Sequence, residues 1–98
     1  MGKRKVTILD TAVRAVAEVS LFIEGKGLLE TAKRFADRAF AFFDNLVDDQ
    51  LLHRPCGYLS WRALNYRCAS FKKKHTVAYL DLSTEIVICE FALTKLLV

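Results

Sequence analysis

Residues 28–47 carry the pattern that most restricts how this chain can fold. Apolar side chains recur there about every 3.6 residues, which places them on one side of a helix, and charged side chains occupy the opposite side. The apolar stripe consists of Leu28, Ala32, Phe35, Ala39, Phe42, Phe43 and Leu46, widened by Leu29, Ala36, Phe40 and Val47. Aromatic side chains at this spacing are typical of a hydrophobic core. We therefore expect a long helix whose apolar side is covered by the rest of the chain.

Another helix is predicted immediately before this one. Residues 6–9 have the composition of a short strand, and Asp10 can cap a helix that starts near Thr11. The apolar face of that helix consists of Ala12, Val16, Val19 and Ile23. Residues 25–27 (Gly-Lys-Gly) end it, because glycine readily adopts the left-handed conformation common after helix C-termini. The connection is so short that the two helices must form a hairpin.

The pattern changes after residues 48–57, a predicted loop that contains the only proline. Alternation with a period of about two residues predicts strands at residues 64–71, 75–82 and 85–91, joined by tight connections and hence antiparallel. The chain, residues 1–98, is long enough for one domain with a single core. We predict an α+β fold: a short first strand, a helical hairpin and a three-stranded antiparallel meander, with the helices on one face of the sheet. The residues predicted to meet between helix and sheet are Phe35, Ala39, Phe42 and Leu46, with either Ile86 and Ile88 or Val87 and Cys89.

The three cysteines are odd in number and scattered, which argues against a disulfide framework. Cys89 lies in an apolar run, where a free cysteine behaves as a small hydrophobe. His53, Cys56 and Cys68 lack the paired Cys-x-x-Cys of a zinc site, so we expect neither a metal nor another cofactor. No apolar run reaches the roughly 20 residues that span a bilayer, and the N-terminus is a poor signal peptide. These features predict a cytoplasmic protein with reduced thiols and no membrane partner.

The formal net charge of +4 is unevenly distributed, with a lysine run directly before the last hairpin. Such a run often only guards a sheet edge against aggregation. Two nearby arginines could extend it into a surface that binds phosphates, while Trp61 and Tyr66 could stack on bases or simply pack on the helices. The residues predicted to bind nucleic acid or another target are Arg62, Arg67, Lys72, Lys73 and Lys74.

His75 follows the lysine run and raises the possibility of catalysis. Cleavage of RNA through its own 2′-hydroxyl needs a base, cations for the developing phosphorane charge and an acid for the leaving oxygen. Side chains of these kinds are present in His75, Lys73, Lys74 and Lys95. Consecutive residues of a strand point to opposite faces, so the sequence does not place these groups together. A solvated sheet edge is the alternative interpretation.

Apolar residues without an obvious place in the core suggest a protein partner. One leucine lies among polar residues of the first predicted helix, and the chain ends in the apolar sequence ALTKLLV. A second protein or a second copy of the chain could cover them. The predicted partner-binding residues are Leu21, Leu93, Leu96 and Leu97.

The order of elements and the residue patterns of several segments resemble those of the RelE/ParE superfamily of toxins from bacterial type II toxin–antitoxin operons. The resemblance covers nearly the whole chain and lies in GLLETAKRFADRAFAFFDNL, WRALNYRCASFKKK and HTVAYLDLSTEIVICEF. Tyr79 matches a tyrosine that family members commonly carry in the third strand. The resemblance implies a toxin that is neutralised by a cognate antitoxin.

Two departures from the ribonuclease branch of that superfamily bear on activity. Thr76 and Leu96 stand where ribonuclease relatives resemble one another in carrying arginine. The resemblance therefore favours the ParE-like branch, whose members poison DNA gyrase, over endoribonucleases that act on mRNA at the ribosome. If the chain is an enzyme, it is expected to be an endoribonuclease. A nucleic-acid or protein binding module of the same fold without toxicity is the third possibility.

Overall fold

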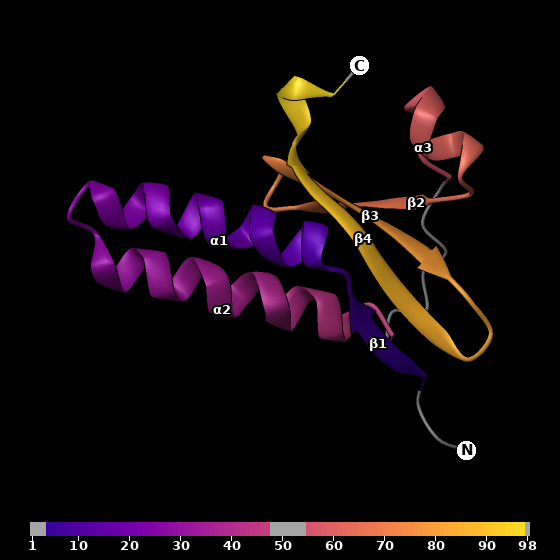
Figure 1. Cartoon of the computed structure of the whole chain (residues 1–98), viewed down its shortest axis with the longest axis horizontal. Helices are drawn as coiled ribbons and strands as arrows, with labels where there is room; N and C mark the ends of the chain where they lie inside the picture. The colour runs from indigo at the N-terminus through magenta and orange to yellow at the C-terminus, as the bar shows by residue number, and fades with distance from the viewer. Residues whose placement is uncertain (1–3, 48–54, 98) are drawn as a thin grey trace.

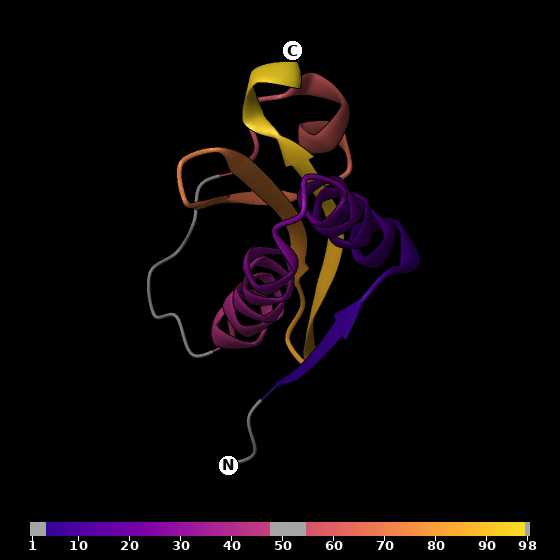
Figure 2. The ribbon, with the colours of Figure 1, turned by 90° about the vertical axis from the view of Figure 1, so that its left-hand side faces the viewer.

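A helical hairpin packs against a four-stranded mixed sheet in the computed structural model, which describes residues 4–47 and 55–97 (Figure 1). The elements are β1 (Lys5–Ile8), α1 (Asp10–Gly25), α2 (Leu29–Asn45), α3 (Leu59–Ala63), β2 (Arg67–Phe71), β3 (His75–Asp81), β4 (Glu85–Leu93) and the short 3₁₀-helix η1 (Thr94–Leu96). Figure 2 shows α1 and α2 side by side over the sheet. The predicted α+β fold, with its short first strand, hairpin and meander, is confirmed.

The strands lie in the order β1-β4-β3-β2. The strands β2, β3 and β4 form the antiparallel meander, while β1 is parallel to β4, with Val6 opposite Ile86. The pairing continues past β1, because the Leu9 N–H donates to the Ile88 carbonyl over 2.9 Å. The helical hairpin follows β1 and leads toward β2 at the opposite edge of the sheet, and the meander then brings β4 back beside β1 as a parallel neighbour.

One extra residue in β4 decides which of its side chains reach the core. Tyr79 pairs with Ile88, whereas Val77, two residues earlier, pairs with Phe91, three residues further along β4. Side chains alternate between faces along a regular strand, and a bulge of one residue shifts that alternation. Ile88 and Phe91 therefore both face the helices although three positions separate them.

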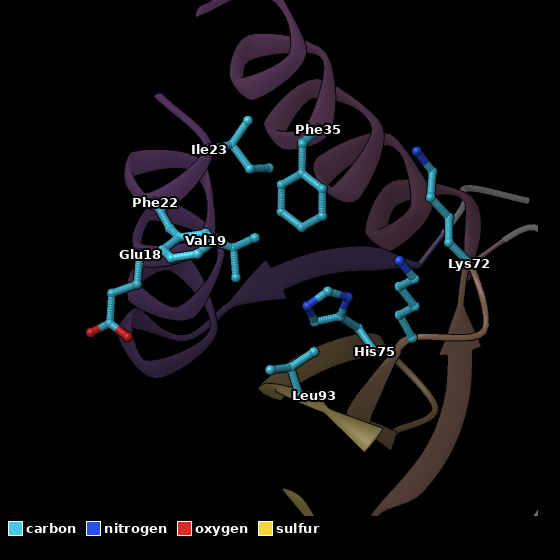
Figure 3. Close-up of a pocket in the computed structure, with 9 residues that line it drawn as sticks. Glu18, Val19, Phe22, Ile23, Phe35, Lys72, His75 and Leu93 are labelled. Atoms are coloured by element: carbon cyan, nitrogen blue, oxygen red, sulfur yellow. The ribbon is translucent and has the colours of Figure 1, made fainter. Parts of the chain in front are cut away.

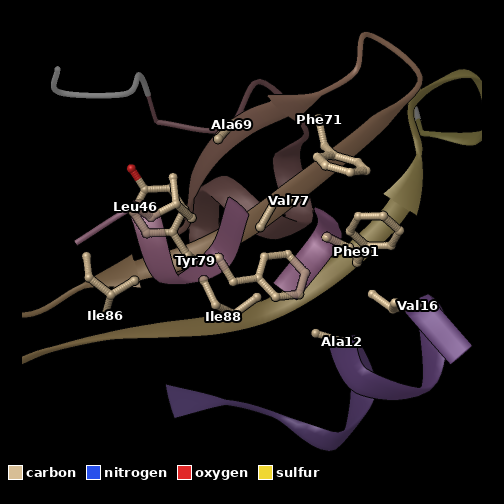
Figure 4. Close-up of a cluster of buried hydrophobic side chains, with 12 residues drawn as sticks. Ala12, Val16, Leu46, Ala69, Phe71, Val77, Tyr79, Ile86, Ile88 and Phe91 are labelled. Atoms are coloured by element: carbon tan, nitrogen blue, oxygen red, sulfur yellow. The ribbon is translucent and has the colours of Figure 1, made fainter. Parts of the chain in front are cut away.

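The core lies between the helical hairpin and the sheet (Figure 4). Its buried members are Ala12, Val16, Ala39, Phe43, Leu46, Ala69, Phe71, Val77, Tyr79, Ile86, Ile88 and Phe91. The predicted helix–sheet contact is confirmed, with Ile86 and Ile88 as its β4 members. The most buried phenylalanine of α2 is Phe43, whereas Phe35 and Phe42 are only partly buried. Phe43 shares one side of the helix with Ala39 and Leu46, and Phe42 is rotated away from it by about 100°.

The first helix begins and ends near its predicted limits. Asp10 is the first residue of α1 and not its cap, and no side chain caps the helix at Leu9. The carboxylate of Asp10 still lies in the first turn, where it complements the helix dipole. At the other end, Gly27 has a φ of 83°, so the predicted left-handed glycine is confirmed.

The predicted strand at residues 64–71 begins later than expected, because α3 and its C-terminal turn occupy residues up to Tyr66. The Tyr66 N–H donates to the Trp61 carbonyl (3.1 Å), and the Asn65 N–H donates to the Arg62 carbonyl (3.0 Å). With Asn65 at a φ of 63°, this is a Schellman turn. A helix of five residues is too short to show a helical period in the sequence. Most of the predicted loop at residues 48–57 lies outside the described residues.

Candidate functional site

A groove with a volume of about 550 Å³ opens between the helical hairpin and the turn that joins β2 to β3 (Figure 3). It is lined by Glu18, Val19, Phe22 and Ile23 of α1, Phe35 of α2, and Lys72, Lys74, His75 and Leu93 from the sheet and its turn. Figure 3 shows Glu18 on one side of the groove and Lys72 on the other, with apolar side chains and the imidazole between them. The groove is an apolar surface with charged residues at its border.

The groove exists because the hairpin extends beyond the sheet, as Figure 1 shows. The buried residues of α1, Ala12 and Val16, both lie in its first half. In the second half, Phe22 is 65% exposed, and the ammonium group of Lys26 lies 4.6 Å from the centre of its ring. The sequence reasoning missed Phe22 because it lies off the predicted apolar stripe. Phe22 is adjacent to Leu21, which is also apolar and also lies off that stripe. This pair could have indicated an exposed apolar surface on α1.

His75 is part of the groove floor and of the aromatic core. It lies on the helix-facing side of β3 with Val77 and Tyr79, and only 7% of it is exposed. Its ring stacks on Phe91, with 4.7 Å between centroids and 12° between planes, and lies 5.7 Å from the ring of Phe35. Burial lowers the pKa of His75, and the nearby charge of Lys74 lowers it further. The imidazole is therefore neutral at neutral pH and is held as an aromatic packing group.

The lowered pKa of His75 predicts that the protein loses stability in mild acid. As pH falls through about 6.5, the unfolded chain binds a proton before the folded chain does, so the free energy of unfolding decreases. The stability that neutral His75 contributes is fully present above the pKa of this histidine in the unfolded chain. It is lost as pH falls toward the lower pKa of the histidine in the folded chain. His75→Phe preserves an aromatic ring in the stack and should remove this part of the decrease. Urea unfolding of both proteins at pH 7.5 and 5.5 checks the prediction, and an equal decrease in both would contradict it.

The lysine turn is exposed and conformationally unfavourable. Lys72 and Lys73 have φ values of 51° and 64°, and the Lys74 N–H donates to the Phe71 carbonyl over 3.3 Å. The left-handed conformation costs non-glycine residues roughly 1–2 kcal/mol each. Asparagine and glycine are the usual residues at such positions. Lysine at both positions is therefore not explained by the folding of the turn.

The four candidate catalytic residues do not converge on one point. Lys73, Lys74 and Lys95 line a second depression of about 500 Å³ together with Leu93 and Thr94. His75 lines the apolar groove, so Lys74 is the only candidate common to both surfaces. Thr76 is buried, and its hydroxyl shares a hydrogen bond of 2.7 Å with Thr94. The lysines thus border the depression as a cationic surface, and the imidazole is in the aromatic core.

The two predicted arginines form a basic site of their own. Arg62 and Arg67 line a depression of about 290 Å³ with Pro55 and Asn65. The length of β2, roughly 13 Å at about 3.3 Å per residue, separates Arg67 from the lysine turn. The five predicted target-binding residues therefore belong to two basic sites at opposite ends of β2.

The predicted partner-binding leucines lie in three places. Leu93 lines the groove, whereas Leu96 is exposed on η1 and Leu97 is half-buried behind it. Leu21 is exposed and lines a shallow apolar depression with Val13. Of the four, only Leu93 borders the groove.

The expectation of reduced thiols is wrong for two of the three cysteines. Cys56 and Cys68 form a disulfide, with 4.9 Å between their Cα atoms, because α3 and its turn bring together residues twelve positions apart. Cys89 is a buried free thiol, as expected, and burial raises its pKa. His53, the third residue of the rejected zinc set, lies outside the described residues.

Among residues 4–47 and 55–97, no three His, Cys, Asp or Glu residues are grouped so that they could hold a metal ion. Within the same ranges, every helix is too short or too polar to cross a membrane. Comparison with known proteins gave no match among protein families, curated proteins or solved structures.

Proposed function

We propose that this chain is the toxin component of a type II toxin–antitoxin system of the RelE/ParE kind, and that it acts by binding its target. The observation that carries the proposal is the apolar groove with lysines at its border. The groove offers contact area and charge, while its histidine is neutral and packed between aromatic rings. These properties suit recognition of a protein better than acid–base catalysis.

The groove suits an amphipathic segment of a cognate antitoxin. Apolar side chains of such a segment would cover Phe22 and Leu93, and acidic side chains would meet Lys72 and Lys74. A segment that becomes ordered on binding can cover a surface of this kind, which is spread over several elements. The left-handed backbone conformation of Lys72 and Lys73 supports a role for this turn in binding, since unfavourable backbone conformations tend to be retained at functional positions.

The same geometry argues against RNA cleavage. A catalytic base must reach the 2′-hydroxyl, but His75 is stacked against Phe91 below the lysines. Loss of one charge-stabilising group typically slows an enzyme by about a hundredfold or more, and both Thr76 and Leu96 replace an arginine expected from ribonuclease relatives. Poisoning a complex requires occupancy and not turnover, so toxicity through a target such as DNA gyrase is compatible with this site.

The proposal is tested by expressing the chain in bacteria while following growth and mapping RNA cleavage. We expect growth arrest with RNA intact, relief of the arrest by the product of an adjacent antitoxin-like reading frame, and inhibition of DNA supercoiling by gyrase. The Lys72→Ala/Lys73→Ala/Lys74→Ala variant should lose the arrest. His75→Phe, which preserves the aromatic packing, should retain it.

Other outcomes would replace the proposal with a named alternative. Specific RNA cuts that disappear in His75→Phe would make the chain an endoribonuclease. Unimpaired growth at high expression would favour a non-toxic binding module of the same fold.

A further inference from the structure

Residues 56–66 form a small structural unit on the face of the sheet opposite to the helical hairpin. Ala69 belongs to the core on the hairpin side, so its neighbour Cys68 points to the other face. Cys56 is attached there through the disulfide. None of the residues of α3 is buried, and the main packing contacts of the fold join α1, α2 and the strands without α3.

The hydrogen bonds of this unit are largely internal. The Arg62 N–H donates to the Tyr58 carbonyl (2.8 Å), and the Schellman turn closes the other end of α3. The rings of Tyr58 and Trp61 meet edge to face, with 5.7 Å between centroids. Their partners lie within the unit, so these interactions shape it without fastening it to the sheet.

Within residues 4–47 and 55–97, two side-chain interactions attach the unit to the sheet, one at Tyr66 and one at the disulfide. The Cys56 N–H donates to the Tyr66 carbonyl over 3.0 Å, which joins the two ends of the unit to each other. Its flanking residues, Pro55 and Arg67, form an isolated bridge at the start of β2. Burial raises the pKa of the Tyr66 hydroxyl, as does its hydrogen bond with the Cys89 thiol. The disulfide is a covalent cross-link between the unit and β2, and neither of its cysteines belongs to the core cluster between hairpin and sheet.

We propose that the Cys56–Cys68 disulfide is a redox-controlled latch. When it is formed, it holds α3 against the sheet and keeps Arg62 beside Arg67 at their shared depression. When it is reduced, residues 57–65 detach while the hairpin and the sheet stay folded. The latch therefore controls whether the two arginines form one basic site.

The exchange requires a dithiol reductant, protein or small molecule. Its thiolate attacks the sulfur of Cys68, because Cys68 is partly exposed and Cys56 is buried. The bond between the two cysteine sulfurs breaks, and Cys56 leaves as a thiolate that takes up a proton. The second thiol of the reductant loses its proton and attacks the reductant sulfur that is now bonded to Cys68. Cys68 then leaves as a thiolate and also takes up a proton. Two electrons pass from the dithiol, which becomes a disulfide, and the protein gains two thiols.

The response would follow the compartment or the oxidative state of the cell. Disulfides persist in oxidising compartments, whereas those in the cytosol are usually transient and often sense redox state. The latch would thus present the arginine pair under oxidising conditions and withdraw it under reducing ones.

Hydrogen–deuterium exchange of the intact protein, measured before and after treatment with dithiothreitol, tests the latch. Alkylation and mass spectrometry should show the disulfide before reduction and two new thiols after it. We expect amide exchange in residues 57–66 to accelerate at least tenfold on reduction, with β3 and β4 unchanged. Cys56→Ser/Cys68→Ser should match the reduced protein with or without dithiothreitol. Cys89→Ser, which replaces the thiol opposite Tyr66 with another hydrogen-bonding group, should respond like the wild type.

Four outcomes would overturn the latch. The disulfide could fail to form in air, or residues 57–66 could exchange equally in the oxidised and reduced proteins. Loss of protection throughout the sheet, or failure of the double serine variant to fold, would instead make the disulfide a requirement of the whole fold.

Discussion

Phe43→Ala is expected to lower the free energy of unfolding by about 3–5 kcal/mol. Phe43 is completely buried, and its ring meets those of Phe40 and Phe91 edge to face at 5.8 and 5.9 Å between centroids. Truncation would remove these contacts and leave a cavity that α2 and the sheet cannot close without moving. Since domains of this kind are stable by only about 5–15 kcal/mol, the loss is a large part of the total.

Urea unfolding followed by circular dichroism measures the effect of Phe43→Ala, and Phe42→Ala is the matched control. Phe42 is one of the four helix residues that the sequence predicted to lie against the sheet. It is only partly buried and packs against Phe71 at 5.3 Å between centroids, so its truncation should cost clearly less. Equal losses in the two variants, or a loss below about 1 kcal/mol for Phe43→Ala, would show that the core is packed differently.

Phe22→Glu should weaken binding of the cognate antitoxin by at least a hundredfold, about 2.7 kcal/mol in binding free energy. This expectation rests on the proposed function. The substitution removes an aromatic side chain from the groove and places a carboxylate where an apolar segment would lie. It would also repel the acidic side chains that are expected to meet Lys72 and Lys74. Because Phe22 is exposed, the stability of the free protein should hardly change.

Isothermal titration of the purified antitoxin checks this expectation, with Leu29→Glu as the control. Leu29 is 63% exposed, close to the 65% of Phe22, and it also lies in the hairpin, but it does not line the groove. The control should bind nearly as tightly as the wild type. Equal weakening by both substitutions would mean that the partner covers the hairpin tip in general, and no weakening by either would exclude the groove as the docking site.

Features that depend on neighbouring residues were predictable from the sequence. The stripe of α2, the apolar face of α1 and the left-handed Gly27 all follow from the spacing or identity of residues a few positions apart. The antiparallel meander follows from the short connections between its strands. In the candidate site, the same local reasoning found the lysine run and His75, but it could not say which way each side chain points.

The errors came from interactions between distant residues. The cysteine count suggested free thiols, yet the Schellman turn at Asn65 returns the chain so that Cys68 meets Cys56. His75 was a candidate base because a run of three lysines directly precedes it in the sequence. Its pairing on β3 turns it toward Phe91 and away from Lys95, which belongs to the neighbouring depression.

The sequence by itself determined the order of the four strands and the two long helices, the helical hairpin and the apolar stripe that α2 presents to the sheet. The spacing of apolar residues encodes these features, because helices and strands form through contacts between residues only a few positions apart. Only the tertiary structure decided that β1 lies parallel to β4, that an extra residue in β4 brings both Ile88 and Phe91 into the core, and that Phe22 and the lysine turn border one groove. Each of these depends on the distance and orientation between segments far apart in the chain, which packing of the whole core sets.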